Sequence, residues 1–244
     1  MARVGLGGRI SRRFGRMCYT KVRLPDTAWT VRRNMLVDLH IHTSNSSPCS
    51  DLSVDEALEA AVELGLDAVA VTEHATHHGA LLAHEAGRKK GFTVFRGVEV
   101  CTTGGDMIVF GAQGDFEPDM EFQELLRMVR SEGGLVIAAH PTHGYWGYHH
   151  RHKGYPPREV LEQVDAVEVL NGGCSYEENV LATRMASELG LPQVGGSDAH
   201  TAPWVGRCVT VFSREVSDET ELVEAILEGN CRAAYLEDVV PILK

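Results

Sequence analysis

Short apolar runs alternate along the chain with segments whose apolar residues recur at helical spacing, from about residue 36 onward. Two helix starts carry capping boxes, Ser53 with Glu56 and Ser175 with Glu178, and several helices are followed by glycine. Strand and helix alternate about seven times. This order is typical of an α/β protein with a parallel sheet, and the length suits a small barrel.

Caps, glycines and turns set the boundaries of the predicted elements. In the first helix, Ala57, Leu58, Ala61 and Val62 share one face and are expected to be buried. Residues 107–111 follow a Gly-Gly-Asp turn and are predicted to return as a hairpin. The predicted strands are 37–43, 68–72, 92–100, 107–111, 135–139, 166–170, 193–195 and 208–212, and the predicted helices are 53–64, 80–90, 118–132, 158–164, 175–189 and 219–228.

Metal-type side chains stand where several of the predicted strands end. His40 and His42 alternate with apolar residues, so on a strand both point to one face and can hold a metal ion. A half-buried strand with two solvated histidines has the same pattern. Further His, Asp and Glu residues follow later apolar runs, namely Glu73, His74, Glu99, His140, Asp198 and His200. Barrel enzymes build their sites at these strand ends, so the side chains are predicted to converge.

The charge of the chain is unevenly distributed. The formal net charge is −11, yet residues 1–34 carry nine Arg or Lys and one acid, which leaves about −19 on residues 35–244. An acidic body argues against a nucleic-acid-binding surface, except for a nucleotide or short oligonucleotide as substrate. An anionic substrate would therefore need metal ions to supply positive charge locally.

We place the folded domain at residues 35–244 and expect the Arg- and Gly-rich segment 1–34 to lie outside it. A basic nucleic-acid arm, an organellar transit peptide and an upstream segment from an early assigned start all fit this composition. The six cysteines form no C-x-x-C pair, which argues against a disulfide framework and favours the cytoplasm. No apolar run reaches 18 residues, so no membrane span is predicted.

The connection at 141–157 is long and is expected to be functional. It contains His143 and the aromatic residues Tyr145, Trp146 and Tyr148. These rings can stack on a nucleobase, form a lid or contact another subunit. The sequence does not decide among these roles, and it does not determine the oligomeric state.

Six motifs, taken in order, resemble those of the PHP (polymerase and histidinol phosphatase) family of metal-dependent hydrolases. They read Asp-Leu-His-Ile-His-Thr at 38–43, Val-Thr-Glu-His at 71–74, Gly-Val-Glu at 97–99, Ala-His-Pro at 139–141, Val-Glu-Val-Leu-Asn-Gly at 167–172 and Gly-Ser-Asp-Ala-His at 196–200. The resemblance implies a distorted (β/α)7 barrel. It also implies a cluster of two or three divalent ions, usually manganese, zinc or iron.

The resemblance further implies three groups of metal ligands. The first ion takes two histidines and two carboxylates, the second shares a carboxylate and adds a histidine, and the third takes two histidines. In order, the groups are His40, His42, Glu99 and Asp198; Glu99 and His140; and His74 and His200. Two ions bridged by Glu99 can share a water and convert it to hydroxide near neutral pH.

Two positions depart from the usual family pattern. Many relatives have an Asp in the loop after the first strand as a further ligand of the third ion. This loop is longer here, and Asp51 is our first choice, with Cys49 as the alternative. Many relatives also have a His where this chain has Asp106. Asp106 is either an oxygen ligand, which favours manganese, or a plain turn residue.

Several other polar residues are candidates for supporting roles. Asp38 and Glu73 are expected to orient His40 and His74, and Glu168 and Asn171 to contact either the ligands or the substrate. His143 is a candidate for protonating the leaving group. Arg207 is a candidate for gripping a phosphate, or else for a surface salt bridge.

These residues predict a metal-dependent phosphoesterase that hydrolyses a small phosphomonoester, such as a nucleotide or a histidinol-phosphate-like compound, through a metal-bridged hydroxide. An amidohydrolase-type hydrolase could use the same cluster on a carbonyl. The alternative that is not an enzyme is a metal-binding PHP module without turnover, although such modules typically lack several ligands.

Overall fold

The computed structural model of this chain describes residues 34–114, 116–145 and 147–240. The proposed extension, apart from Asn34, lies outside the described residues, as does Trp146 of the long connection. Contacts within the chain separate Met1–Val31 from Arg32–Lys244, and the fold below is that of the second unit.

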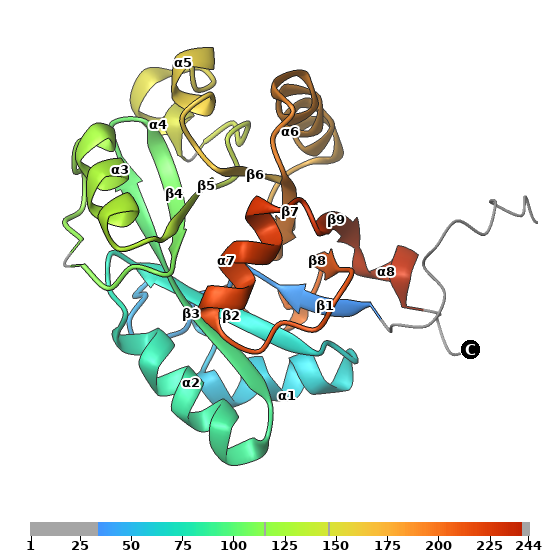
Figure 1. The fold of residues 1–244 in the computed structure, drawn as a ribbon. Coiled ribbons are helices and arrows are strands. Elements are labelled where there is room, and N and C mark those ends of the chain that lie inside the picture. Colours follow the sequence, from blue (N-terminus) through green and yellow to red (C-terminus); the bar gives the residue numbers. More distant parts are fainter. Residues whose placement is uncertain (1–33, 115, 146, 241–244) are drawn as a thin grey trace, which may run out of the picture. The chain divides into compact units, whose positions relative to one another are not determined.

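Nine strands of the described part form one sheet that curves into a nearly closed barrel, as predicted (Figure 1). Their order is β7-β6-β5-β4-β3-β2-β1-β8-β9, and only β4 and β8 run against the others. The strands are β1 (Met35–Asp38), β2 (Ala68–His74), β3 (Thr93–Thr102), β4 (Gly105–Phe110), β5 (Leu135–Ala138), β6 (Ala166–Asn171), β7 (Gln193–Gly196), β8 (Cys208–Phe212) and β9 (Cys231–Tyr235).

The barrel closes where β7 approaches β8. The Thr210 hydroxyl donates to the Gly195 carbonyl and accepts from the Gly195 N–H, both at 2.9 Å. A side chain at position 195 would bring its Cβ to 2.8 Å from the Val209 carbonyl oxygen, so the close approach requires glycine.

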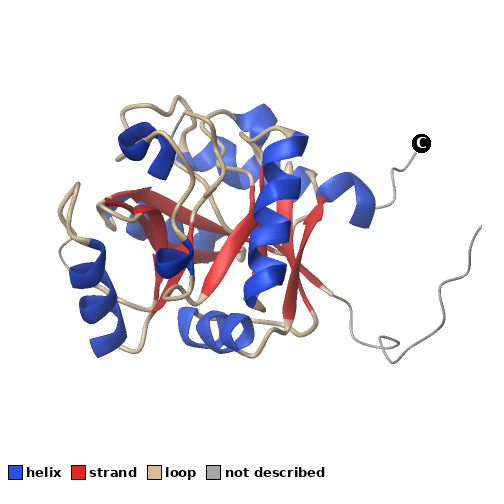
Figure 2. Cartoon of the chain, turned by 90° about the horizontal axis from the view of Figure 1, so that it is seen from above, coloured by secondary structure: helices blue, strands red, loops and turns tan. Residues whose placement is uncertain are grey.

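Helices flank the strands on the outside of the barrel (Figure 2). They are α1 (Val54–Glu63), α2 (His78–Lys90), α3 (Phe122–Ser131), α4 (Tyr148–His152), α5 (Arg158–Leu161), α6 (Tyr176–Leu189), α7 (Glu219–Leu227) and α8 (Leu236–Val239). The exception in position is α7, which lies over the centre of the ring of strands in Figure 1. Its Leu222 and Ile226 are fully buried in one cluster with Met35 at the start of β1, so α7 covers the end where the parallel strands begin. The opposite end is left for a site.

Most predicted elements are present, and the exceptions have physical causes. The hairpin β3–β4 and the caps Ser53, Ser175 and Asp218 are confirmed. The predicted burial of Val62 is wrong, because this residue is 59% exposed. Helix α1 contacts the barrel through a narrower stripe of Ala57, Leu58 and Ala61.

The first strand differs from its predicted extent. Its regular ladder ends at Asp38, and the chain continues through a single bridge between Ile41 and Ala199. The prediction also missed α4, inside the long connection, and β9 and α8 near the end of the chain.

Candidate metal centre

The predicted metal-type side chains meet at the end of the barrel where the parallel strands finish. They come from the segment after β1, the end of β2, the middle of β3, the hairpin strand β4 and the loops after β5 and β7. His140 and Asp198 both have positive φ, 27° and 52°, which marks the sharp turns that follow β5 and β7. The residues are His40, His42, His74, Glu99, Asp106, His140, Asp198 and His200.

The first ligand group has the spacing of a single coordination sphere. The Nε2 atoms of His40 and His42 lie 3.0 Å apart. Each lies 3.4–3.5 Å from a carboxylate oxygen of Glu99 and from Oδ1 of Asp198. A tetrahedral ion with bonds of about 2.0–2.1 Å separates its ligand atoms by about 3.3 Å. The spacing of the four side chains is therefore close to that of ligands around one ion.

The second ligand group shares Glu99 with the first. His140 Nε2 lies 3.0 Å from Glu99 Oε1, and Asp106 places a carboxylate oxygen within ligand spacing of both. Gly147 borders this group, because a Cβ there would lie 3.4 Å from His140 Nδ1 and 3.5 Å from Asp106 Oδ2. Asp106 is thus beside the cluster rather than at a remote hairpin turn.

Removal of Asp106 tests its predicted role. We expect Asp106→Ala to lower the bound metal by about one ion per chain, because the second group would keep only Glu99 and His140. Metal analysis of the purified protein measures this. Asp55→Ala, at the exposed start of α1, is the control and should leave the metal content unchanged. An equal metal content in both variants would contradict a ligand role.

The third ligand group comprises His42, His74 and His200, whose ligand atoms lie within 4.8 Å of one another. Cys49 is adjacent, with Sγ 3.3 Å from His74 Nε2. Asp51 and Cys49 are both exposed, and neither is among the described groups of three that could hold an ion. The Asp51 backbone N–H donates to the His200 carbonyl at 3.1 Å.

Glu168 holds the first two groups in position. Its Oε1 accepts from His40 Nδ1 at 3.0 Å, while Oε2 accepts from the His140 backbone N–H and from the Asn171 side-chain amide, both at 2.9 Å. With Nδ1–H donated to a carboxylate, His40 directs the lone pair of Nε2 into the cluster. The positioning of His40 thus depends on Glu168.

Asp38 has a different role from the one expected. It is fully buried and accepts from the backbone N–H groups of Ser197 and Gly206 at 2.8 Å, and from that of His40 at 3.3 Å. It thus joins the end of β1 to the loops after β7 without contacting the His40 ring. Burial raises the pKa of Asp38 to about 6 despite these donors.

Glu73 likewise contacts the loop after β1 rather than the His74 ring. Its carboxylate accepts from the Thr43 N–H at 3.1–3.2 Å and from the hydroxyls of Thr43 and Ser47. Ser47 Oγ also lies 3.3 Å from His42 Nδ1. Ser47 therefore links Glu73 to the first ligand group, a contact that no motif in the sequence indicated.

The buried groups strongly perturb one another. Burial lowers the pKa of His42 to about 4, so this ring is neutral and able to coordinate near pH 7. Burial also opposes the charging of His140, but its hydrogen bond to Glu99 and the charge of Glu99 raise its pKa to about 10. Burial alone would raise the pKa of Glu99. The charge of His40 and hydrogen bonds from histidines outweigh this effect and hold the pKa well below its usual value.

The donor set fits divalent metal ions. The facing Nε2 atoms of His40 and His42 can share at most one proton, whereas an ion would satisfy both lone pairs. His140 Nδ1 is buried and has no hydrogen-bond partner in the described part of the chain. Imidazole suits zinc and iron, and the three carboxylates add the oxygen donors that manganese prefers.

The two predicted catalytic residues outside the ligand set lie at different distances from it. His143 is half-buried next to the cluster: its N–H donates to the His140 carbonyl at 3.0 Å, and the two rings are 6.0 Å apart. Arg207 is exposed, and its guanidinium lies 4.1 Å from the centre of the Trp204 ring. It makes no direct contact with the metal-type cluster.

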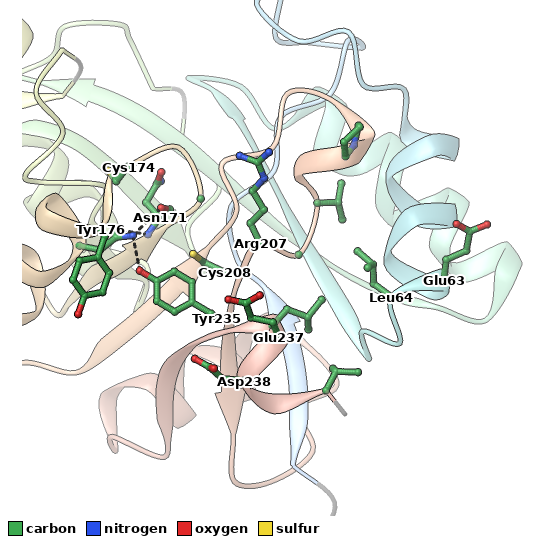
Figure 3. A pocket seen from close by; sticks show the side chains of 17 residues that line it. Glu63, Leu64, Asn171, Cys174, Tyr176, Arg207, Cys208, Tyr235, Glu237 and Asp238 are labelled. Carbon is green, nitrogen blue, oxygen red and sulfur yellow. Dashed lines mark hydrogen bonds between the residues drawn. The ribbon is translucent and has the colours of Figure 1, made fainter. Parts of the chain in front are cut away.

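Arg207 borders a cavity of about 1030 Å³ beside the cluster (Figure 3). Its guanidinium points away from Tyr235 and Glu237. Asn171 connects this cavity to the metal centre, because its side-chain amide donates to Glu168 and its backbone N–H to Asn179 at 3.0 Å. The sequence analysis did not predict this cavity or the position of Trp204.

Comparison with known families agrees with this geometry. The chain matches two families. One is described as PHP domain and covers residues 38–188, and the other is described as PHP-associated and covers residues 177–231. This α/β barrel with clustered metal-type ligands therefore belongs to the PHP domain family.

Individual similar proteins extend the comparison. An uncharacterized protein of Methanocaldococcus jannaschii is 30% identical over 146 residues, 56% of this chain and 82% of that protein. A two-domain protein of Bacteroides vulgatus, containing a predicted PHP-like metal-dependent phosphoesterase, superposes with a TM-score of 0.68 at 17% identity over 91% of this chain and 70% of that one. The lesion-specific endonuclease PfuEndoQ of Pyrococcus furiosus gives 0.63 at 16% identity over 82% and 58%. These structural similarities establish the fold.

None of the helices in the described ranges has both the length and the apolar composition that a membrane span requires.

Proposed function

We propose that residues 35–244 form a metal-dependent phosphoesterase that hydrolyses a small phosphomonoester in the cytoplasm. The observation that carries the proposal is the position of Glu99. Its Oε1 lies within 3.5 Å of His40 and His140, and its Oε2 within 3.4 Å of His42 and His74. With ligand side chains next to both of its oxygens, Glu99 would help to hold two ions of the centre.

Ions at this centre would supply Lewis acidity and an activated water for attack on phosphorus. The protein contributes fixed ligand positions, through Glu168 behind His40 and through Asp38 behind the loop at Ser197. Because residues 35–244 carry about −19 formal charges, the rest of the domain gives an anionic ester little attraction. The substrate is therefore expected to bind at the metal centre.

His143 is the proposed donor of a proton to the leaving group. It lies on the loop that follows His140, and burial together with the nearby His140 lowers its pKa below the ordinary value. A lowered pKa makes the protonated ring a stronger acid, which suits donation of a proton to a leaving group. Arg207, stacked on Trp204, is proposed to bind a more distant anionic part of the substrate.

The third ion is proposed to take a further ligand from the loop after β1, where Asp51 and Cys49 are the two candidates, and the ions are proposed to be manganese, zinc or iron. A phosphodiester is the natural second substrate to test, because one of the structurally similar proteins is an endonuclease. The acidic surface of the present domain favours the smaller monoester.

The deciding experiment is hydrolysis of an aryl phosphate monoester by protein reconstituted with manganese. Turnover that disappears with a chelator and returns with manganese would support the proposal. An aryl phosphodiester and an aryl amide, run in parallel, distinguish an endonuclease-like activity and the amidohydrolase alternative. Metal-loaded protein that hydrolyses none of the three would favour the non-catalytic module.

A further inference from the structure

Cys49 lies at the exposed side of the third ligand group, in the loop between β1 and α1. Its Sγ is 3.3 Å from His74 Nε2. A tetrahedral zinc ion, with bonds of about 2.3 Å to sulfur and 2.0–2.1 Å to nitrogen, holds two such ligands about 3.5 Å apart. The observed separation is therefore close to that of a cysteine and a histidine on one ion.

Hydrogen bonds prepare the two neighbouring histidines to coordinate an ion through Nε2. His200 Nδ1 lies 2.9 Å from the Asp198 carbonyl oxygen, which can only accept, so Nδ1 carries the proton and Nε2 keeps its lone pair. His74 Nδ1 lies 3.0 Å from Glu99 Oε2, which favours the same tautomer. Cys49, His74 and His200 thus offer one sulfur and two nitrogen donors.

The loop is anchored so that Cys49, and not Asp51, faces this group. The buried Ser50 hydroxyl lies 2.9 Å from the His42 carbonyl and 3.2 Å from the His200 carbonyl. On the other side of Ser50, the backbone of Asp51 is held against the His200 carbonyl. The side chains of Asp51 and Cys49 are both exposed, but the sulfur of Cys49 contacts a ligand histidine.

We propose that Cys49 is a thiolate ligand of the third ion and makes this position selective for a soft metal such as zinc. When the ion binds, the Cys49 thiol releases its proton to solvent and its sulfur forms a bond to the metal. The Glu99–Asp106–His140 group, with two carboxylates and one imidazole, favours a harder ion such as manganese. The chain would therefore hold a mixed-metal centre. The inference rests on the proposed metal dependence but not on turnover.

The test uses cobalt(II) added to the chelator-treated full chain, because a thiolate bound to cobalt(II) gives an intense charge-transfer absorption. We expect this absorption in the unaltered protein and its loss in Cys49→Ser, with about one ion fewer per chain. It should persist in Cys101→Ser, which alters the cysteine next to Asp106, and in Asp51→Ala. Cys49→Asp should restore the ion count without the absorption and bind less zinc when zinc and manganese compete.

Either of two results would overturn the inference: unchanged absorption in Cys49→Ser, or loss of the third ion in Asp51→Ala while Cys49→Ser retains it. Turnover of the aryl phosphate is measured separately on the same samples. Protein that shows the Cys49-dependent absorption but no turnover would refute the proposed phosphoesterase function and leave the thiolate ligand established.

Discussion

Glu99→Gln is expected to lower turnover and metal affinity by more than about 100-fold, since loss of even an outer partner of a ligand costs 10–100-fold. Glutamine keeps the size of the side chain but offers one oxygen instead of two and presents an amide N–H₂ to the cations. The buried Glu99 carboxylate lies against four histidines, so one half of the bridge would lose its ligand. Activity assays and metal titration on the same preparation measure the effect.

The matched control is Glu85→Gln on the exposed face of α2. Glu85 makes an ion pair with Arg88 at 3.0 Å and belongs to no described ligand group, and exposed pairs of this kind contribute little to stability. We expect unchanged metal content and turnover in this variant. If Glu99→Gln matched the control in both, Glu99 would not be the bridge and the proposed mechanism would be wrong.

Gly196→Ala is expected to destabilise the fold by about 1–3 kcal/mol and to weaken metal binding at the same time. A Cβ at this position would lie 2.4 Å from the His40 Cβ and 2.8 Å from Glu168 Oε1. Neither neighbour can move freely, because His40 is fully buried and Glu168 is hydrogen-bonded to it. The added methyl group must therefore push the end of β7 away from the first ligand group. Thermal unfolding of the metal-free protein measures the loss of fold stability separately from the loss of metal binding.

Gly154→Ala provides the control for this substitution. A Cβ at position 154 would meet no heavy atom within 4 Å, and the backbone there is not in the left-handed region. We expect a change of no more than about 0.5 kcal/mol in the free energy of unfolding, which is usual for a surface substitution. Equal unfolding midpoints for the two variants would show that β7 relaxes easily, and His40 would then not be rigidly placed.

The metal centre combines ligands whose supports differ in kind. His40 is fixed by the buried carboxylate Glu168, while Cys49 and His74 lie at the solvent-facing side, where the His74 side chain is 47% exposed. The first group is thus held in place before any ion binds, and the third is more open to exchange with solvent.

The sequence by itself determined the elements and the metal-type motifs, because both depend on short separations along the chain. A capping box needs two residues three positions apart, and His40 and His42 face one way because extended chain alternates. The positions of Glu99 on the third parallel strand and of His140 just after the next one followed from the same local patterns. Their convergence was predictable because parallel strands finish at one end of a barrel.

The tertiary structure alone decided which groups touch across long separations. Glu168 meets His40 although 128 positions separate them, and Arg207 stacks on Trp204 instead of entering the cluster. In the irregular loop after β1, no periodicity fixes side-chain direction, so the sequence could not choose between Cys49 and Asp51. The structure anchors that loop through the buried Ser50 hydroxyl, which needs acceptors and lies near the carbonyls of His42 and His200, and it places Cys49 Sγ 3.3 Å from His74 Nε2.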